Sequence, residues 1–260
     1  MTAKQKGPII IIGFLMLLVG TLLGMVLMFA ASNKGSAQAD KPDTTEITQT
    51  SRHSDPSCAC DADRFKNEYE SLNGKDTGYD GKKYTAISIP KDNPIEYVDY
   101  TRVKQTLMSG TGVIYFGFPE CPWCRSLVPV LIDAADEYGI DNIMYFNNKS
   151  ERNAMHLDDD GNVVIDSEGT EDYKELLDLL GDYASVYKGL DDESIKRLYF
   201  PTVVFVKDGE IVYFHEDTVD SQEDPYVMLD ADQQKELKGI MREGFAALYP
   251  QRCSVDEKGC

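Results

Sequence analysis

The chain has 260 residues, of which 42% are hydrophobic, and its formal net charge at pH 7 is −19. This length has room for a membrane anchor and one elaborated domain with an ordinary core. The acidity argues against binding to nucleic acid and against electrostatic docking to anionic lipid, since both need clusters of Lys and Arg.

An apolar segment near the N-terminus predicts a membrane-spanning helix. The stretch Ile9–Ala31 is almost wholly apolar and long enough to cross a bilayer. Lys4 and Lys6 precede it, so the positive-inside rule keeps the N-terminus in the cytoplasm. We expect residues 1–33 to be an uncleaved signal anchor, which makes the chain a single-pass cell-membrane protein with an extracytoplasmic C-terminal domain. The triplet Ala37-Gln38-Ala39 leaves a cleaved, secreted form open.

The next two segments predict a linker and a short extension. Residues 34–60 are rich in small and polar residues, which indicates a flexible linker. Cys58 and Cys60 at its end are too close to bond to each other without strain, so each is expected to pair elsewhere or stay free. Residues 61–94 are interpreted as an N-terminal extension packed on the main domain, with a helix over Asp61–Leu72 and a strand over Tyr84–Ile89.

Residues 95–146 show the alternating pattern of an α/β domain. Apolar runs separated by capped, amphipathic stretches predict the order β-α-β-α-β. The expected elements are a strand over Ile95–Val98, a helix from its cap Asp99 to Met108, a strand over Gly112–Phe118, a helix over Pro122–Tyr138 and a strand over Asn142–Phe146.

The segment 147–196 departs from this compact pattern and is strongly acidic. It contains an amphipathic helix, Glu171–Leu180, and an aspartate-rich turn, Asp158–Asn162. The turn lacks the closing glutamate of an EF-hand, so we interpret it as a solvated turn and not as a calcium site.

A hairpin and a final helix complete the domain. Two apolar runs flank Asp208-Gly209 within Phe200–Phe214, which is a strong hairpin signal. A last helix is expected over Ala231–Leu248. Cys253 and Cys260 lie close together in the polar tail 251–260, where they are expected to form a structural disulfide.

The motif Cys121-Pro122-Trp123-Cys124 lies between a predicted strand and a predicted helix. A thiolate at a helix N-terminus is stabilised by the helix dipole and by free N–H groups. This lowers the pKa of Cys121 and makes it the attacking sulfur. Cys124 lies one turn later on the same face and can close a disulfide with it.

Two other interpretations of the motif remain open but are weaker. A zinc site would need two further ligands, and the three histidines, His53, His156 and His215, are scattered. A purely structural Cys121–Cys124 disulfide is the other alternative. We expect no metal and no cofactor.

The Cys-Pro-Trp-Cys motif, the Phe200-Pro201-Thr202 strand start and the Asp-Gly hairpin together resemble the thioredoxin superfamily over residues 95–250. More narrowly, Tyr115–Cys121 and Ser88–Pro94 resemble membrane-tethered thioredoxin-like proteins of Gram-positive bacteria, including bacteriocin transport accessory proteins. The resemblance implies a central mixed sheet flanked by helices, with residues 147–196 as an acidic insertion before a strand that begins with a cis-proline.

The resemblance also implies roles for individual residues. Cys121 matches the nucleophilic cysteine and Cys124 the resolving one. Pro201 matches the cis-proline that faces them, and Phe200 precedes it where the family's backbone binds an extended substrate. The variable dipeptide Pro122-Trp123 tunes the redox potential and borders the substrate.

Two positions depart from the family pattern. Thioredoxins proper have an acidic residue six positions before the first cysteine, and here that residue is Tyr115. The residue before the cis-proline is usually smaller than Phe200. Both departures bear on the rate of resolution and on the fit of the substrate.

We therefore expect an extracytoplasmic thiol–disulfide oxidoreductase that acts on protein or peptide thiols and disulfides, as a reductant or as an oxidant. A membrane redox partner or a transporter is its expected partner, and nucleic acid is not. The alternative is a non-catalytic thioredoxin-like accessory module or chaperone for an exported peptide or a membrane transporter.

Overall fold

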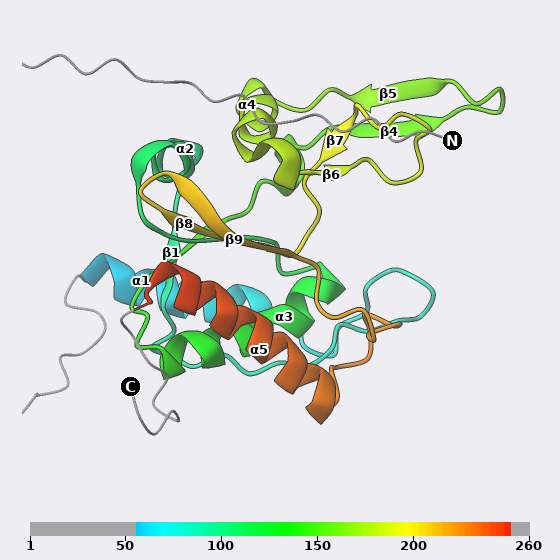
Figure 1. Ribbon diagram of the computed structural model, residues 1–260. Helices are drawn as coiled ribbons and strands as arrows, with labels where there is room; N and C mark the ends of the chain where they lie inside the picture. Colours follow the sequence, from blue (N-terminus) through cyan, green and yellow to red (C-terminus); the bar gives the residue numbers. More distant parts are fainter. Residues whose placement is uncertain (1–55, 251–260) are drawn as a thin grey trace, which may run out of the picture. The chain divides into compact units, whose positions relative to one another are not determined.

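A five-stranded mixed sheet organises residues 56–250, which are the residues that the computed structural model describes (Figure 1). The three strands at one side, in the order β1-β3-β2, are parallel, and β8 and β9 continue the sheet antiparallel. This arrangement confirms the predicted α/β class with a mixed central sheet. The strands are β1 (Ile95–Tyr97), β2 (Gly112–Phe116), β3 (Ile143–Phe146), β8 (Thr202–Lys207) and β9 (Glu210–Glu216).

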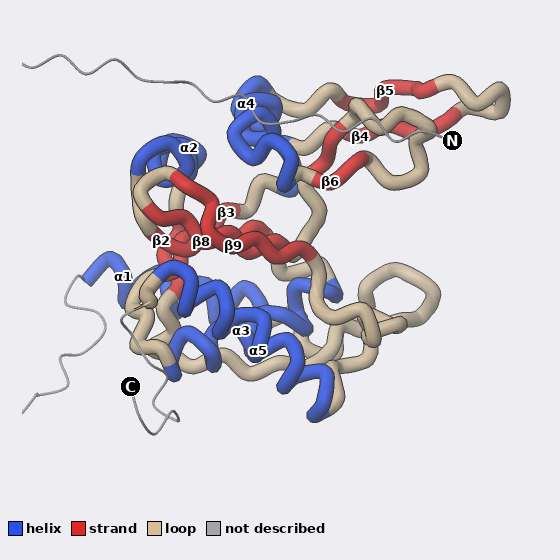
Figure 2. Tube along the Cα trace, in the orientation of Figure 1, coloured by secondary structure: helices blue, strands red, loops and turns tan. Residues whose placement is uncertain are grey.

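Helices cover both faces of the sheet (Figure 2). On one face lie α1 (Pro56–Glu70), α3 (Pro122–Glu137) and α5 (Ala231–Leu248); on the other lie α2 (Tyr100–Ser109) and α4 (Glu171–Leu180). Local capping explains where two of them begin. The carboxylate of Asp99 accepts the N–H of Arg102 at the start of α2, and Asp230 and Gln233 form a capping box at the start of α5.

The core joins helix α1 to the centre of the sheet. The ring of Phe65 lies 4.9 Å from that of Tyr145 and 6.4 Å from that of Tyr115, measured between centroids. All three side chains are fully or almost fully buried. Residues 61–94 therefore share one hydrophobic core with β2 and β3.

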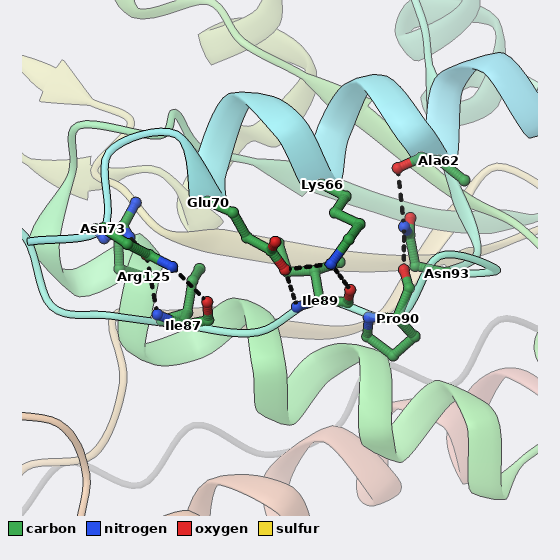
Figure 3. Close-up of polar contacts among 9 residues, drawn as sticks. All are labelled: Ala62, Lys66, Glu70, Asn73, Ile87, Ile89, Pro90, Asn93 and Arg125. Carbon is green, nitrogen blue, oxygen red and sulfur yellow. Dashed lines mark hydrogen bonds and ion pairs between the residues drawn. The ribbon is translucent and has the colours of Figure 1, made fainter.

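The strand predicted over Tyr84–Ile89 is wrong, although Ile87 and Ile89 are buried in alternation as in a strand. Side chains bind this backbone where a neighbouring strand would (Figure 3). The amide of Asn73 donates to the carbonyl of Ile87 at 2.8 Å and accepts its N–H at 3.0 Å, and Glu70 accepts the N–H of Ile89 at 2.7 Å. The alternation of buried and exposed residues is present, but this segment pairs with no neighbouring strand.

Several predicted boundaries also differ from the structure, most clearly at α1 and β2. Helix α1 begins at Pro56 and ends at Glu70, whereas a helix over Asp61–Leu72 was expected. Its end precedes a turn in which Gly74 has a φ of +70°, a conformation that glycine adopts without strain. Strand β2 ends at Phe116, two residues earlier than expected, because the chain leaves the sheet toward the cysteine motif.

Residues 147–196 form a group of small elements on the α2 side of the sheet (Figure 1). Helix α4 has the predicted bounds, and the aspartate-rich turn joins the two strands of a hairpin, where the carboxylate of Asp158 accepts the N–H groups of Asp160 and Asn162. The other elements are η1 (Lys149–Glu151), β4 (Ala154–Leu157), β5 (Val163–Ser167), η2 (Gly181–Tyr183), β6 (Ser185–Val186) and β7 (Lys196–Arg197).

Among residues 56–250, no helix is long and apolar enough to cross a membrane. The predicted anchor over residues 1–33, most of the predicted linker, and the tail 251–260 with Cys253 and Cys260 lie outside the described residues.

Candidate active site

Cys121 is the N-cap of helix α3, directly after the loop that leaves β2. Its sulfur accepts the N–H of Cys124 at 3.4 Å, and Pro122 occupies the first helical turn, where a backbone N–H has no intrahelical partner. Both cysteines are free thiols. Cys121 is 6% exposed and Cys124 is fully buried, so the first of the two is the one open to a substrate.

The surroundings of the two thiols shift their pKa values in opposite directions. The pKa of Cys121 is lowered by a hydrogen bond from the Cys124 thiol, by the N–H groups of Cys124 and Trp123 and by the charge of Arg152, against the effect of burial. The pKa of Cys124 is raised well above its usual value, first by burial and then by Cys121. Cys121 therefore ionises first, in the direction that its position at the helix N-terminus predicts.

The residue pair Phe200-Pro201 lies opposite the cysteines, at the start of β8. The Cys121 thiol donates to the carbonyl oxygen of Phe200 at 3.7 Å across 79 residues of sequence, and the Phe200–Pro201 peptide bond is cis. Both residues are buried, and the ring of Phe200 packs edge-on against that of Phe118 at 5.4 Å. The structure thus brings together the residues that the resemblance assigned to one site.

A pocket of about 430 Å³ opens beside Trp123. Trp123 and its neighbour Pro122 are partly exposed, next to the buried thiols. Across the pocket, the imidazole of His215 is hydrogen-bonded to the carbonyl of Thr218 at 2.9 Å, and burial lowers the pKa of His215. Nothing in the sequence indicates this pocket beside the cysteine motif, because Trp123 and the other residues that line it are distant in sequence.

Tyr115, a fully buried side chain of β2, lies in the core near Cys124. Its hydroxyl lies 2.9 Å from the hydroxyl of Tyr69. Burial raises the pKa of Tyr115 well above its usual value, so its hydroxyl stays neutral. Gly117 makes room for this ring, because a Cβ there would lie 2.2 Å from the Tyr115 hydroxyl oxygen.

Arg125, which follows Cys124, is completely buried and has no carboxylate partner among the described residues. Its guanidinium donates to the carbonyls of Tyr69 at 2.8 Å, Thr85 at 2.7 Å and Pro119 at 3.3 Å, and to the side chain of Asn73 (Figure 3). It thereby ties the loop that precedes Cys121 to the end of α1. Sequence reasoning missed this role, since the partners are distant in sequence and mostly backbone oxygens.

The remaining candidates do not join this site. Cys60 is an exposed free thiol on α1, and the proposed Cys253–Cys260 disulfide lies outside the described residues. Within the described part of the chain, no group of three or more His, Cys, Asp or Glu side chains could hold a metal ion.

Comparison with protein-family models finds no match to this chain, and comparison with the curated proteins finds none either.

Proposed function

We propose that this chain is a thiol–disulfide oxidoreductase with a thioredoxin-like fold and that Cys121 and Cys124 are its reacting groups. One observation carries the proposal: Cys121 contacts both Cys124 and the Phe200 carbonyl. Two thiols in one helical turn, with pKa values shifted apart, suit an attacking and a resolving sulfur. The sheet order and the helices on both faces are compatible with the thioredoxin-like fold.

As a reductase, the reduced site reacts in two steps. The Cys121 thiolate attacks one sulfur of a substrate disulfide, which forms a mixed disulfide and releases the first substrate thiolate. Cys124 then loses its proton and attacks the Cys121 sulfur, which releases the second substrate thiolate and leaves a Cys121–Cys124 disulfide. Two electrons pass to the substrate. As an oxidase, the same steps run in reverse.

The substrate of this reaction is a protein or peptide in an extended conformation. Its backbone would lie beside Phe200, and the side chain next to its cysteine would enter the pocket beside Trp123. The apolar segment Ile9–Ala31 supports a location at the extracytoplasmic side of the cell membrane. A membrane redox partner or a transporter would restore the starting redox state of the cysteine pair.

Turnover of a disulfide-bonded peptide by the full-length protein in detergent tests the proposal. We expect Cys121→Ser to abolish turnover and Cys124→Ser to accumulate a mixed disulfide. Cys60→Ser is the matched control and should keep the wild-type rate, because this thiol is exposed and lies outside the site. Equal rates for the wild type and Cys121→Ser would contradict the proposal and favour the non-catalytic accessory module.

A further inference from the structure

A cation from the segment 147–196 packs on Phe200, the residue whose carbonyl contacts Cys121. Arg152 follows the short helix η1, and its guanidinium carbon lies 4.2 Å from the centroid of the Phe200 ring. Its Nη1 donates to the carbonyl of Leu198 at 3.1 Å. The backbone carbonyl of the same Phe200 contacts the Cys121 sulfur, so one residue touches both the guanidinium and the thiol, and the charge of Arg152 lowers the pKa of Cys121.

Within residues 56–250, Arg152 has no anionic partner. None of the ion pairs among the described residues includes Arg152, and its Nε is buried without a hydrogen-bond partner. Burial and the charge of Arg197 both lower the pKa of Arg152. A partly buried cation without a carboxylate gains most from an anion that forms beside it.

The other charged and titratable groups around Cys121 do not supply that anion. Cys124 on α3 and Tyr115 on β2 both have raised pKa values, so both stay neutral. His215 on β9 lines the pocket beside Trp123 and is not an anion. Glu120 precedes Cys121, but its carboxylate lies 3.8 Å from the ammonium group of Lys149. The Cys121 thiolate is therefore the natural counter-charge for Arg152.

We propose that Arg152 is the counter-ion of the Cys121 thiolate, so that the inserted segment sets the reactivity of the site. This inference deepens the proposed function and rests on it for its catalytic consequence. Reduction of the Cys121–Cys124 disulfide takes up two electrons and one proton to give one thiolate and one thiol. A cation that stabilises the thiolate favours this reduced state and makes the pair a stronger oxidant.

The test compares Arg152→Met with Arg152→Lys in the full-length protein. Methionine keeps an unbranched stem over Phe200 without the charge, and lysine keeps the charge. The fraction of Cys121 thiolate at mildly acidic pH is measured by its ultraviolet absorbance, with Cys121→Ser as the baseline. We expect Arg152→Met to lower this fraction by about tenfold and Arg152→Lys to restore most of it.

A second measurement is the redox equilibrium with glutathione. Arg152→Met should shift it toward the Cys121–Cys124 disulfide by about tenfold, equivalent to about 30 mV. Lys174→Met is the matched control within the same segment, because Lys174 pairs with Glu168 and Glu171. This substitution should leave the thiolate fraction and the redox equilibrium unchanged.

The outcomes separate this inference from the proposed function. An unchanged thiolate fraction in folded Arg152→Met would overturn the counter-ion role, even if the wild type reduces peptide disulfides. Equal peptide turnover by the wild type and Cys121→Ser would remove the proposed function and leave the thiolate measurement intact.

A wild-type measurement covers the case in which Arg152→Met does not fold. The Arg152 Nε resonance, assigned from the spectrum of Arg152→Lys, should shift with pH at the same midpoint as the Cys121 thiolate absorbance. The shift should vanish in Cys121→Ser. A resonance that does not respond to Cys121 ionisation would also overturn the inference.

Discussion

The hydroxyl groups of Tyr69 and Tyr115 lie 2.9 Å apart in the core beneath Cys124. Tyr69 belongs to α1, and Tyr115 belongs to the strand that leads to the cysteine motif. The N-terminal extension therefore packs next to the strand that leads to Cys121 and Cys124. The two hydroxyls form a buried, neutral pair, since burial raises the pKa of each well above its usual value.

Tyr115→Phe should slow resolution of the mixed disulfide. The Tyr115 hydroxyl lowers the pKa of Cys124 by a hydrogen bond, which opposes the larger effect of burial. Loss of a hydrogen bond worth about 1 kcal/mol lengthens the lifetime of the mixed disulfide about fivefold. Quenched-flow alkylation measures this lifetime.

Tyr213→Phe is the control for that experiment. Tyr213 hydrogen-bonds Glu243 at the surface between β9 and α5, so its removal should leave the lifetime unchanged. A wild-type lifetime in Tyr115→Phe would show that the hydroxyl does not assist Cys124.

Arg125→Met should destabilise the protein by about 3 kcal/mol or more, because it leaves several buried carbonyl oxygens without a donor. Urea unfolding of the reduced protein measures the change. Arg64→Met is the matched control: Arg64 is exposed on α1 and pairs with Glu68, so the loss should be about 0.5 kcal/mol or less. Similar losses in the two variants would contradict the anchoring role of Arg125.

Local signals in the sequence predicted most of the fold. Helix α5 has its expected bounds because the capping box of Asp230 and Gln233 and the apolar periodicity agree. The strand predicted over Tyr84–Ile89 is wrong because alternating burial does not show which groups bind the backbone. Here the side chain of Asn73 binds the backbone of Ile87, where a strand would have a neighbouring strand.

The candidate site was predictable only where its residues carry a local motif. The Cys121–Cys124 pair and the proline-led strand were visible in sequence. Arg125 and Arg152 were not, because each contacts residues that are distant in sequence, such as Tyr69 for Arg125 and Leu198 for Arg152. No pattern along the chain distinguishes them from surface arginines.

Two glycines of α5 should respond oppositely to alanine. At Gly244 a Cβ would lie 2.4 Å from ring carbons of Phe205, and at Gly239 it would meet no atom within 4 Å. We expect Gly239→Ala to gain up to about 1 kcal/mol from helix propensity. Gly244→Ala should lose about 1–2 kcal/mol, since the clash with the ring exceeds that gain. Thermal unfolding compares them, and equal stabilisation of both would contradict the close packing of α5 on β8.

The stability of the reduced protein should depend on pH through Cys121. Its pKa is lower in the folded state than in the unfolded state, so its ionisation adds stability above the unfolded thiol pKa of about 8.5. This contribution is lost as the pH falls through the folded pKa. The raised pKa of Cys124 lowers the stability of the folded protein only at higher pH. There the Cys124 thiol ionises in the unfolded state but not in the folded state.

Urea unfolding of the reduced wild type and of Cys121→Ser, measured from acidic pH up to about pH 8.5, isolates the contribution of Cys121 ionisation to stability. The difference in unfolding free energy should grow in favour of the wild type as the pH rises. A difference that stays constant would mean that the folded protein does not stabilise the Cys121 thiolate.

Mapping of the mixed disulfide is the most direct test of whether Cys121 is the attacking thiol. Full-length Cys124→Ser is incubated with a disulfide-bonded peptide, and digestion with mass spectrometry locates the adduct. We predict one dominant adduct at Cys121, which the wild type resolves and Cys121→Ser does not form. An adduct only at the exposed thiol of Cys60, equally abundant in Cys121→Ser, would contradict it.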